Sequence, residues 1–105
     1  MQDLSSLLAT LRQGFERLLG DQLEAIYLYG SQARGDAQPT SDIDILAVIQ
    51  GEFNHLDLLE TTAPVTCTLS LENDVVISSA FISKSRFDTE KSPFILNVKR
   101  EGVPL

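Results

Sequence analysis

Residues 29–45 read YGSQARGDAQPTSDIDI, and this stretch decides the fold. It joins the end of one apolar run to the start of another, and both runs have the composition of buried β-strands. Asp42 and Asp44 are two positions apart on the second strand, so both carboxylates point to the same face. Ile43 and Ile45 then point to the other face. The stretch therefore predicts two strands, the second beginning with a pair of acids.

This acid pair has the chemistry of a divalent-metal site. Two neighbouring carboxylates repel each other and raise one pKa, and a bound cation removes that conflict. Mg²⁺ prefers hard oxygen ligands, usually one or two carboxylates together with substrate phosphates. Two such ions ~3.5–4 Å apart can activate an attacking oxygen and stabilise a leaving one. Taken alone, however, an Asp-Ile-Asp sequence also fits an edge strand with two solvated acids.

Gly30 and Ser31 follow the first strand directly and fit a phosphate site. A glycine lets a phosphate approach the backbone closely, and the Ser31 hydroxyl lies near backbone N–H groups if a helix begins there. Arg34, the one basic residue nearby, could contact phosphate or pair with Asp36 or Asp42. Gly-Ser after a strand is also a common turn. When ten residues separate this Gly-Ser pair from an acid pair, the combination indicates a binding site for a triphosphate beside a metal site, as nucleotidyl transfer requires.

The whole chain predicts an α/β (α+β) fold, a mixed β-sheet flanked by helices. In the first half of the chain we expect a helix with an apolar stripe from Leu4 that ends near Gly20, then strands over Ala25–Tyr29 and Asp42–Ile49. A helix over about 64–72, with Pro64 in its first turn, should lead into a strand over Val75–Ile82 and a loop. The chain should end with a helix from Pro93 to about Arg100 and a short edge strand over Val103–Leu105.

The net charge of −7 is unevenly distributed, which limits the possible partners. From Glu16 to Asp74 there are eleven acidic residues and two basic ones, so direct nucleic-acid binding is not expected. From Lys84 to Arg100 there are five basic residues and two acidic ones. This segment could meet an acidic partner or form an ordinary solvated surface. Its candidate docking residues are Arg86, Lys91, Lys99 and Arg100.

The remaining composition predicts a cytoplasmic protein. Cys67 is the single cysteine, so no internal disulfide can form, and we expect this thiol to be a small buried hydrophobe in a reducing compartment. The N-terminus lacks a basic region followed by an apolar run, so no signal peptide is expected. No apolar run approaches the length of a membrane span, so no membrane partner is expected.

The motif Gly30-Ser31, ten residues and then Asp42-Ile43-Asp44 resembles the signature of the DNA polymerase β-like nucleotidyltransferase superfamily. The fuller string and the small size are similar to its minimal nucleotidyltransferase (MNT) branch, with one domain over residues 1–105. The resemblance implies Mg²⁺ held by the two aspartates and an ATP triphosphate held by Gly30 and Ser31. It also implies an antitoxin that transfers AMP to a tyrosine of a HEPN ribonuclease toxin and so neutralises it.

The chain departs from this family pattern at the third carboxylate. The superfamily has a third catalytic, metal-binding acid on a later strand, but the expected strand Val75–Ile82 carries none. Asp74, directly before that strand, is the candidate, and Glu72 is the fallback. Asp74 could equally be a turn residue in Glu-Asn-Asp. Without a third acid, the base that deprotonates the acceptor hydroxyl is unassigned, and turnover could be slow or the base could come from the partner.

Two other functions stay open. One is transfer to a small molecule such as an antibiotic, which needs an acceptor pocket that so short a chain is poorly able to build. The other is a binding-only antitoxin that masks its partner sterically, which the missing third acid favours. Among the remaining residues, Tyr27 and Tyr29 fit the core better than base stacking, and His55 fits the surface or a helix cap better than a ligand role.

Overall fold

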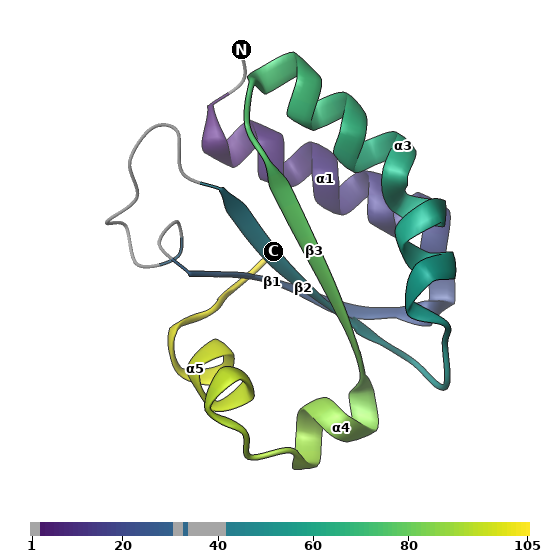
Figure 1. Cartoon of the computed structure of the whole chain (residues 1–105), viewed down its shortest axis with the longest axis vertical. Coiled ribbons are helices and arrows are strands. Elements are labelled where there is room, and N and C mark those ends of the chain that lie inside the picture. Colours follow the sequence, from purple (N-terminus) through teal and green to yellow (C-terminus); the bar gives the residue numbers. More distant parts are fainter. Residues whose placement is uncertain (1–2, 31–32, 34–41) are drawn as a thin grey trace.

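Two strands, β1 and β2, form the centre of a mixed four-stranded sheet (Figure 1). The computed structural model describes residues 3–30, 33 and 42–105. β1 (Leu23–Tyr29) and β2 (Ile43–Ile49) pair antiparallel. β3 (Ile77–Ser83) lies parallel to the outer side of β2, and β4 (Val103–Pro104) lies antiparallel to the outer side of β1. The strand order β3-β2-β1-β4, with helices against it, confirms the expected mixed sheet flanked by helices.

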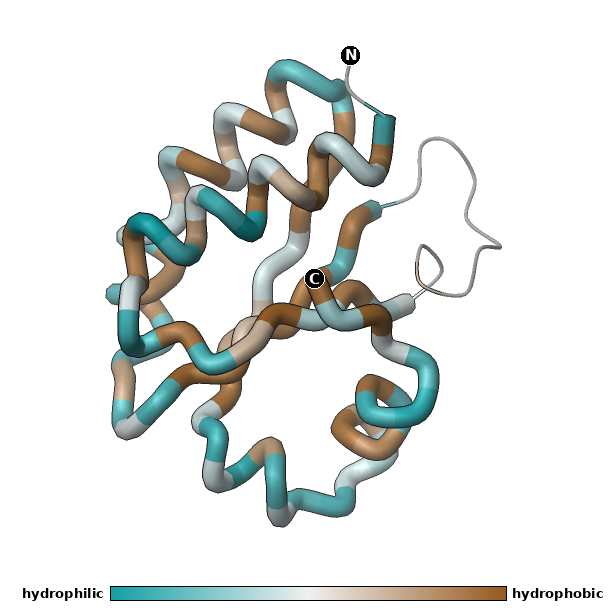
Figure 2. Tube along the Cα trace, turned by 180° about the vertical axis from the view of Figure 1, so that it is seen from behind, coloured by the Kyte–Doolittle hydropathy of each residue, from teal (hydrophilic) through white to brown (hydrophobic). Residues whose placement is uncertain are grey.

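Helices cover both faces of the sheet. Before β1, the chain forms α1 (Leu4–Leu19) and the short 3₁₀ helix η1 (Gly20–Gln22). Between β2 and β3, it forms α3 (His55–Asn73). α1 and α3 pack side by side on one face, whereas α4 (Lys84–Thr89) and α5 (Pro93–Glu101) lie on the other (Figure 1). The view from behind in Figure 2 shows hydrophobic residues concentrated on the strands and polar residues along the outer sides of the helices. The sheet is thus the middle layer of the molecule.

The strand β2 divides the core into two clusters. Ile43, Ile45, Ala47 and Ile49 pack towards α1 and α3, while Leu46 and Val48 pack towards α4 and α5. This alternation follows from the period of two along a strand, and the almost continuous apolar sequence follows from burial on both faces. The expected orientation of Ile43 and Ile45 is confirmed. Asp42 and Asp44 consequently belong to the face of α4 and α5.

α3 is longer than the sequence predicted. It begins at His55 rather than near residue 64, and Pro64 lies inside it instead of in its first turn. The side chain of Asn54 caps the helix by accepting from the Asp57 N–H at 3.1 Å. Pro64 removes one helical hydrogen bond, but its ring is on the exposed side, and burial of Leu58, Val65 and Leu69 against the core holds both halves together. Burial therefore outweighs the local penalty of the proline.

Two smaller expectations also need correction. The segment after β3 was expected to be a loop, but Lys84–Thr89 forms α4, which Ser83 caps and the i,i+4 ion pairs Lys84–Asp88 and Arg86–Glu90 support. Cys67 is exposed on α3 rather than buried. Most strand ends lie within two residues of the expected positions, and the last helix runs to Glu101.

α1 and α3 approach closely at one glycine. A Cβ built at Gly14 would lie 2.7 Å from Cγ2 of Val65, so only glycine fits between the two helices without displacing that side chain. Within the described part of the chain, none of the helices has a stretch of apolar residues that would fit a lipid bilayer.

Candidate active site

The acid pair lies at the end of the sheet where β2 begins. Asp42 immediately precedes β2 and is exposed, and Asp44 is its second residue and is half-buried. Burial raises the pKa of the Asp44 carboxyl, and repulsion from the Asp42 charge raises it further. The Asp42 carboxylate is therefore near enough to oppose the ionisation of Asp44, which is the electrostatic situation that a cation relieves.

Gly30 brings the end of β1 against Asp44. Its φ of +77° lies in the left-handed region, and a Cβ at this position would be 2.8 Å from Oδ2 of Asp44. Any other residue would thus meet both backbone strain and a carboxylate oxygen. Ser31 and Arg34, for which the sequence predicts nucleotide-binding roles, lie outside the described residues, and so does Gln32.

Tyr29 is the partner of Asp44 across the β1–β2 pair. Its ring packs edge-to-face on Phe94 of α5, with centroids 5.2 Å apart, and is half-buried. Burial raises the pKa of its phenol, and the charge of Asp44 adds to the effect. Tyr27, two residues earlier, stacks on Phe87 at 5.3 Å in the cluster beneath α4 and α5. The expected core role fits Tyr27, whereas Tyr29 lies at the margin of the acid pair.

The structure does not bring a third acid to this pair among the residues that it describes. Asp74 is the C-terminal cap of α3 in a left-handed turn, with φ 51° and ψ 49°, and its backbone N–H donates to Ser70. The residue beside Asp44 on β3 is Ser78, its partner in the parallel register. No three His, Cys, Asp or Glu side chains of the described residues are placed to share a metal ion.

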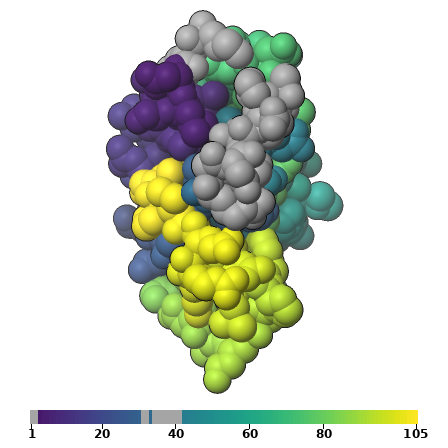
Figure 3. Space-filling view, turned by 90° about the vertical axis from the view of Figure 1, so that its left-hand side faces the viewer, coloured from purple at the N-terminus to yellow at the C-terminus, as the bar shows by residue number. Residues whose placement is uncertain are grey.

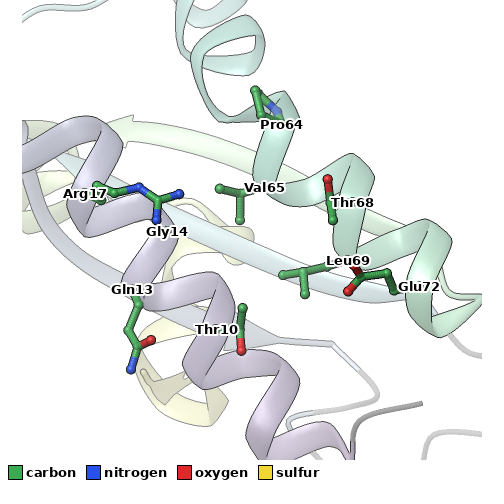
Figure 4. A pocket seen from close by; sticks show the side chains of 9 residues that line it. All are labelled: Thr10, Gln13, Gly14, Arg17, Pro64, Val65, Thr68, Leu69 and Glu72. Carbon is green, nitrogen blue, oxygen red and sulfur yellow. The ribbon is translucent and has the colours of Figure 1, made fainter.

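Glu72, the fallback for the third acid, lies on the other side of the sheet. It lines a groove of about 380 Å³ between α1 and α3. Figure 4 shows its carboxylate at one end of this groove, beyond Leu69, with Arg17 on the facing helix. The alternation of β2 places this groove on the face opposite the acid pair.

A small hollow adjoins the acid pair on the β1 side. It has a volume of about 140 Å³ and lies between the end of β1 and one stripe of α5. Its lining residues are Tyr29, Gly30, Phe94, Asn97, Val98 and Glu101. The α5 residues are spaced i, i+3, i+4 and i+7, which is one face of a helix. Phe94 and Asn97 were not among the predicted site residues, although their helical spacing is visible in the sequence.

Most of the basic residues near the C-terminus have partners within their own segment. Arg86 pairs with Glu90 at 2.6 Å, and Arg100 donates to Oδ1 of Asn97 at 2.7 Å. Lys99 lies over the ring of Phe87 and donates to the carbonyl of Asp88. Figure 3 shows α4 and α5 forming the lower part of this side of the molecule, below α1. These contacts favour a solvated, internally paired surface over a dedicated docking patch.

His55 is the first residue of α3, exposed, and its ring meets Phe81 edge-on at 5.4 Å. Asn54 supplies the cap, so the surface interpretation of His55 holds and the capping one does not.

Comparison with known proteins supports one family. The family model for "Polymerase beta, Nucleotidyltransferase" matches residues 15–101. A Methanocaldococcus jannaschii protein whose name proposes a protein adenylyltransferase is 29% identical over 101 residues, which cover 96% of this chain and 97% of that protein.

Two solved structures share the fold. A Sulfolobus solfataricus protein proposed to be a nucleotidyltransferase is 25% identical with a TM-score of 0.59, covering 96% of this chain and 83% of that one. A chain from a toxin–antitoxin structure with AMP-PNP is 18% identical with a TM-score of 0.64, covering 97% of this chain and 72% of that one. The family match includes β1, β2 and the acid pair, so this chain belongs to the polymerase β-like nucleotidyltransferase family.

Proposed function

We propose that this chain is a magnesium-dependent protein adenylyltransferase that transfers AMP from ATP to a tyrosine of a HEPN toxin and acts as its antitoxin. The observation that carries the proposal is the acid pair at the start of β2, in contact with the glycine that ends β1. The name of the M. jannaschii relative supports a protein acceptor. The toxin–antitoxin structure with AMP-PNP, an ATP analogue, supports a toxin partner and an adenine nucleotide.

The donor set at the site fits Mg²⁺. Both candidate ligands are hard carboxylate oxygens, and burial and the Asp42 charge raise the pKa of Asp44, which a bound cation would lower. Mg²⁺ is commonly held by two carboxylates with substrate phosphates completing the coordination. Asp42 and Asp44 would hold the ion, which would supply charge neutralisation and orientation for the phosphates when bound.

The chain's own residues would act on the nucleotide by position. Gly30 leaves room for a phosphate to approach the backbone beside Asp44, because it lacks a side chain. Ser31 and Arg34 are proposed to contact the triphosphate from the segment that follows. In the transfer, the acceptor hydroxyl oxygen bonds to the α-phosphorus, the bond to pyrophosphate breaks, and the hydroxyl proton leaves to a base. No third acid of the described residues joins Asp42 and Asp44 in a metal-binding group, and we propose that the partner supplies the base.

Intact-mass spectrometry of the partner tests this proposal. Incubation of the chain with ATP, Mg²⁺ and the toxin encoded beside it should add the mass of one or more AMP groups to the toxin. Peptide mapping should then place the groups on tyrosine. Asp42→Asn and Asp44→Asn should abolish the addition while the variants stay folded. A toxin whose mass stays unchanged with every nucleoside triphosphate would exclude the activity.

A binding-only antitoxin is the second candidate, and Ser78 is the observation that favours it. The residue beside Asp44 on β3 carries a hydroxyl where a third acid would serve catalysis. Protection by steric masking should survive replacement of both aspartates by alanine, whereas catalytic protection should not. A toxin-inhibition assay with the double variant separates the two functions.

A further inference from the structure

The hollow beside Gly30 is lined by an aromatic ring and a side-chain amide. Phe94 remains 43% exposed although it is a large aromatic residue, and it meets Tyr29 edge-to-face. Asn97 stands one helical turn further along α5, and its Oδ1 is engaged by Arg100. The amide nitrogen of Asn97 is thereby oriented as the donor end of the group. An exposed aromatic ring beside a side-chain amide offers both stacking and hydrogen bonding to a flat heterocycle.

The hollow also shares two of its lining residues with the surroundings of Asp44. Gly30 lines it and contacts Asp44, and Tyr29 lines it and pairs with Asp44 across the strands. A ligand in the hollow would therefore extend to the proposed phosphate site along Gly30. This continuity requires a ligand with a phosphate end and an aromatic end, which describes a nucleotide.

In-line geometry distinguishes the donor's side of the site from the acceptor's side. In phosphoryl transfer the attacking oxygen and the leaving oxygen lie on opposite sides of the phosphorus. If the leaving pyrophosphate lies by Gly30 on the β1 side, the acceptor hydroxyl must enter from the β3 side. On that side, Val76 is 58% exposed and Ser78 is exposed. Both alternate with the odd-numbered residues of this segment, as do Ala80 and Ile82, so they belong to the same face of the sheet as the acid pair. The hollow is therefore left for the donor.

We propose that the hollow between Tyr29 and α5 binds the nucleobase of the donor nucleotide, with the base against Phe94 and its edge towards Asn97. This inference rests on the proposed function, since it takes the acid pair and Gly30 as the phosphate site. The acceptor approaches over β3, away from α5. The competing assignment, an aromatic acceptor side chain in the same hollow, is an outcome of the test below.

Binding measurements with and without a base test the assignment. Isothermal titration of the full chain with Mg²⁺ should give a lower Kd for ATP than for inorganic tripolyphosphate, which keeps the phosphates and lacks the base. Phe94→Ala should weaken ATP binding about 5- to 150-fold, since base–aromatic stacking contributes ~1–3 kcal/mol. The same variant should leave tripolyphosphate binding unchanged. Phe94→Tyr, which keeps the ring, should retain ATP affinity.

Leu96→Ala is the matched control. Leu96 is on the same helix, 47% exposed and outside the hollow, so its loss should change neither Kd. Equal Kd values of the unmodified chain for ATP and tripolyphosphate would overturn the inference and leave the proposed function standing. Unchanged ATP affinity in Phe94→Ala with slower transfer would also overturn it, in favour of an acceptor subsite. Failure of the unmodified chain to bind either ligand would contradict the proposed function itself.

Discussion

The two faces of the sheet are built for different tasks. The face of α1 and α3 is packed mainly with apolar side chains and carries the larger core cluster. The face of α4 and α5 has a smaller cluster, which gives way to Asp44, Asp42 and an open hollow where β2 begins. The difference shows that one strand, β2, can stabilise the core along most of its length and carry Asp44 of the candidate active site at its start. Changes on the two faces should therefore separate activity from stability.

The largest effect is expected from removing one charge of the acid pair. Asp42→Asn should lower the rate of AMP transfer about a thousandfold, because a metal ion stabilises several kcal/mol of transition-state charge and each 1.36 kcal/mol is tenfold in rate. Circular dichroism should show an unchanged fold, since Asp42 is exposed. A variant that retains most of its transfer rate would place the chemistry elsewhere.

The corresponding change on the other face should act on stability alone. Phe15 is 0% exposed and stacks near Phe81 with centroids 6.5 Å apart. Phe15→Ala should lower the free energy of unfolding by about 3–5 kcal/mol, a large part of the total for a domain of this size. Urea denaturation measures this loss. Any molecules that remain folded at low temperature should transfer AMP at the normal rate, and a lowered rate per folded molecule would mean that the two faces are coupled.

Much of this division could be predicted from the sequence, because it depends on local rules. The period of two along a strand places Asp44 opposite Ile43 and Ile45 without any knowledge of the fold. Pro64 misled the prediction of α3, because the cost of a proline is local while the burial that offsets it comes from packing on α1 and the sheet.

What could not be predicted depends on pairing between distant segments. The register of β2 with β3 decides that Ser78, not Asp74, stands beside Asp44. The pairing of β4 with β1 draws the end of α5 to Gly30 and so creates the hollow. Neither register is recorded in the spacing of residues within one element, so the helical spacing of Phe94 and Asn97 did not indicate that they lie beside Gly30.

The contact between α1 and α3 allows a smaller change in stability to be tested on their face of the sheet. Gly14→Ala should lower the free energy of unfolding by about 1–2 kcal/mol, because the added methyl would displace Val65 and overpacking outweighs the gain in helix propensity. In a Val65→Ala background the same change should cost less or even stabilise. A double-mutant cycle by denaturation measures this coupling, and strictly additive effects would contradict the proposed contact.

On the face that carries the acid pair, Ser78 permits a test in which a carboxylate is added rather than removed. Ser78→Asp would place a third carboxylate beside Asp44 and should raise Mg²⁺ affinity about tenfold, since ligand charge tunes the affinity of carboxylate sites. Ser78→Asn has a similar size without the charge and should leave the affinity unchanged. Titration of Mg²⁺ in the presence of ATP measures both. Equal affinities of the two variants would show that position 78 does not reach the ion.

The smallest expected effect concerns the metal-free protein. The pKa of Asp44 is raised in the folded state by burial and by Asp42, so the folded protein binds this proton more tightly than the unfolded chain. The ionised carboxylate therefore costs stability at neutral pH, and the cost disappears as the pH falls and Asp44 becomes protonated in both states. Asp44→Asn in EDTA should melt a few degrees higher than the unmodified chain at pH 7 and at nearly the same temperature near pH 3. Added Mg²⁺ should stabilise only the unmodified chain, because the ion binds the charged pair. If Asp44→Asn melts at a lower temperature than the unmodified chain at pH 7 in EDTA, Asp44 stabilises the metal-free fold. The ionised carboxylate would then not reduce the stability of the protein.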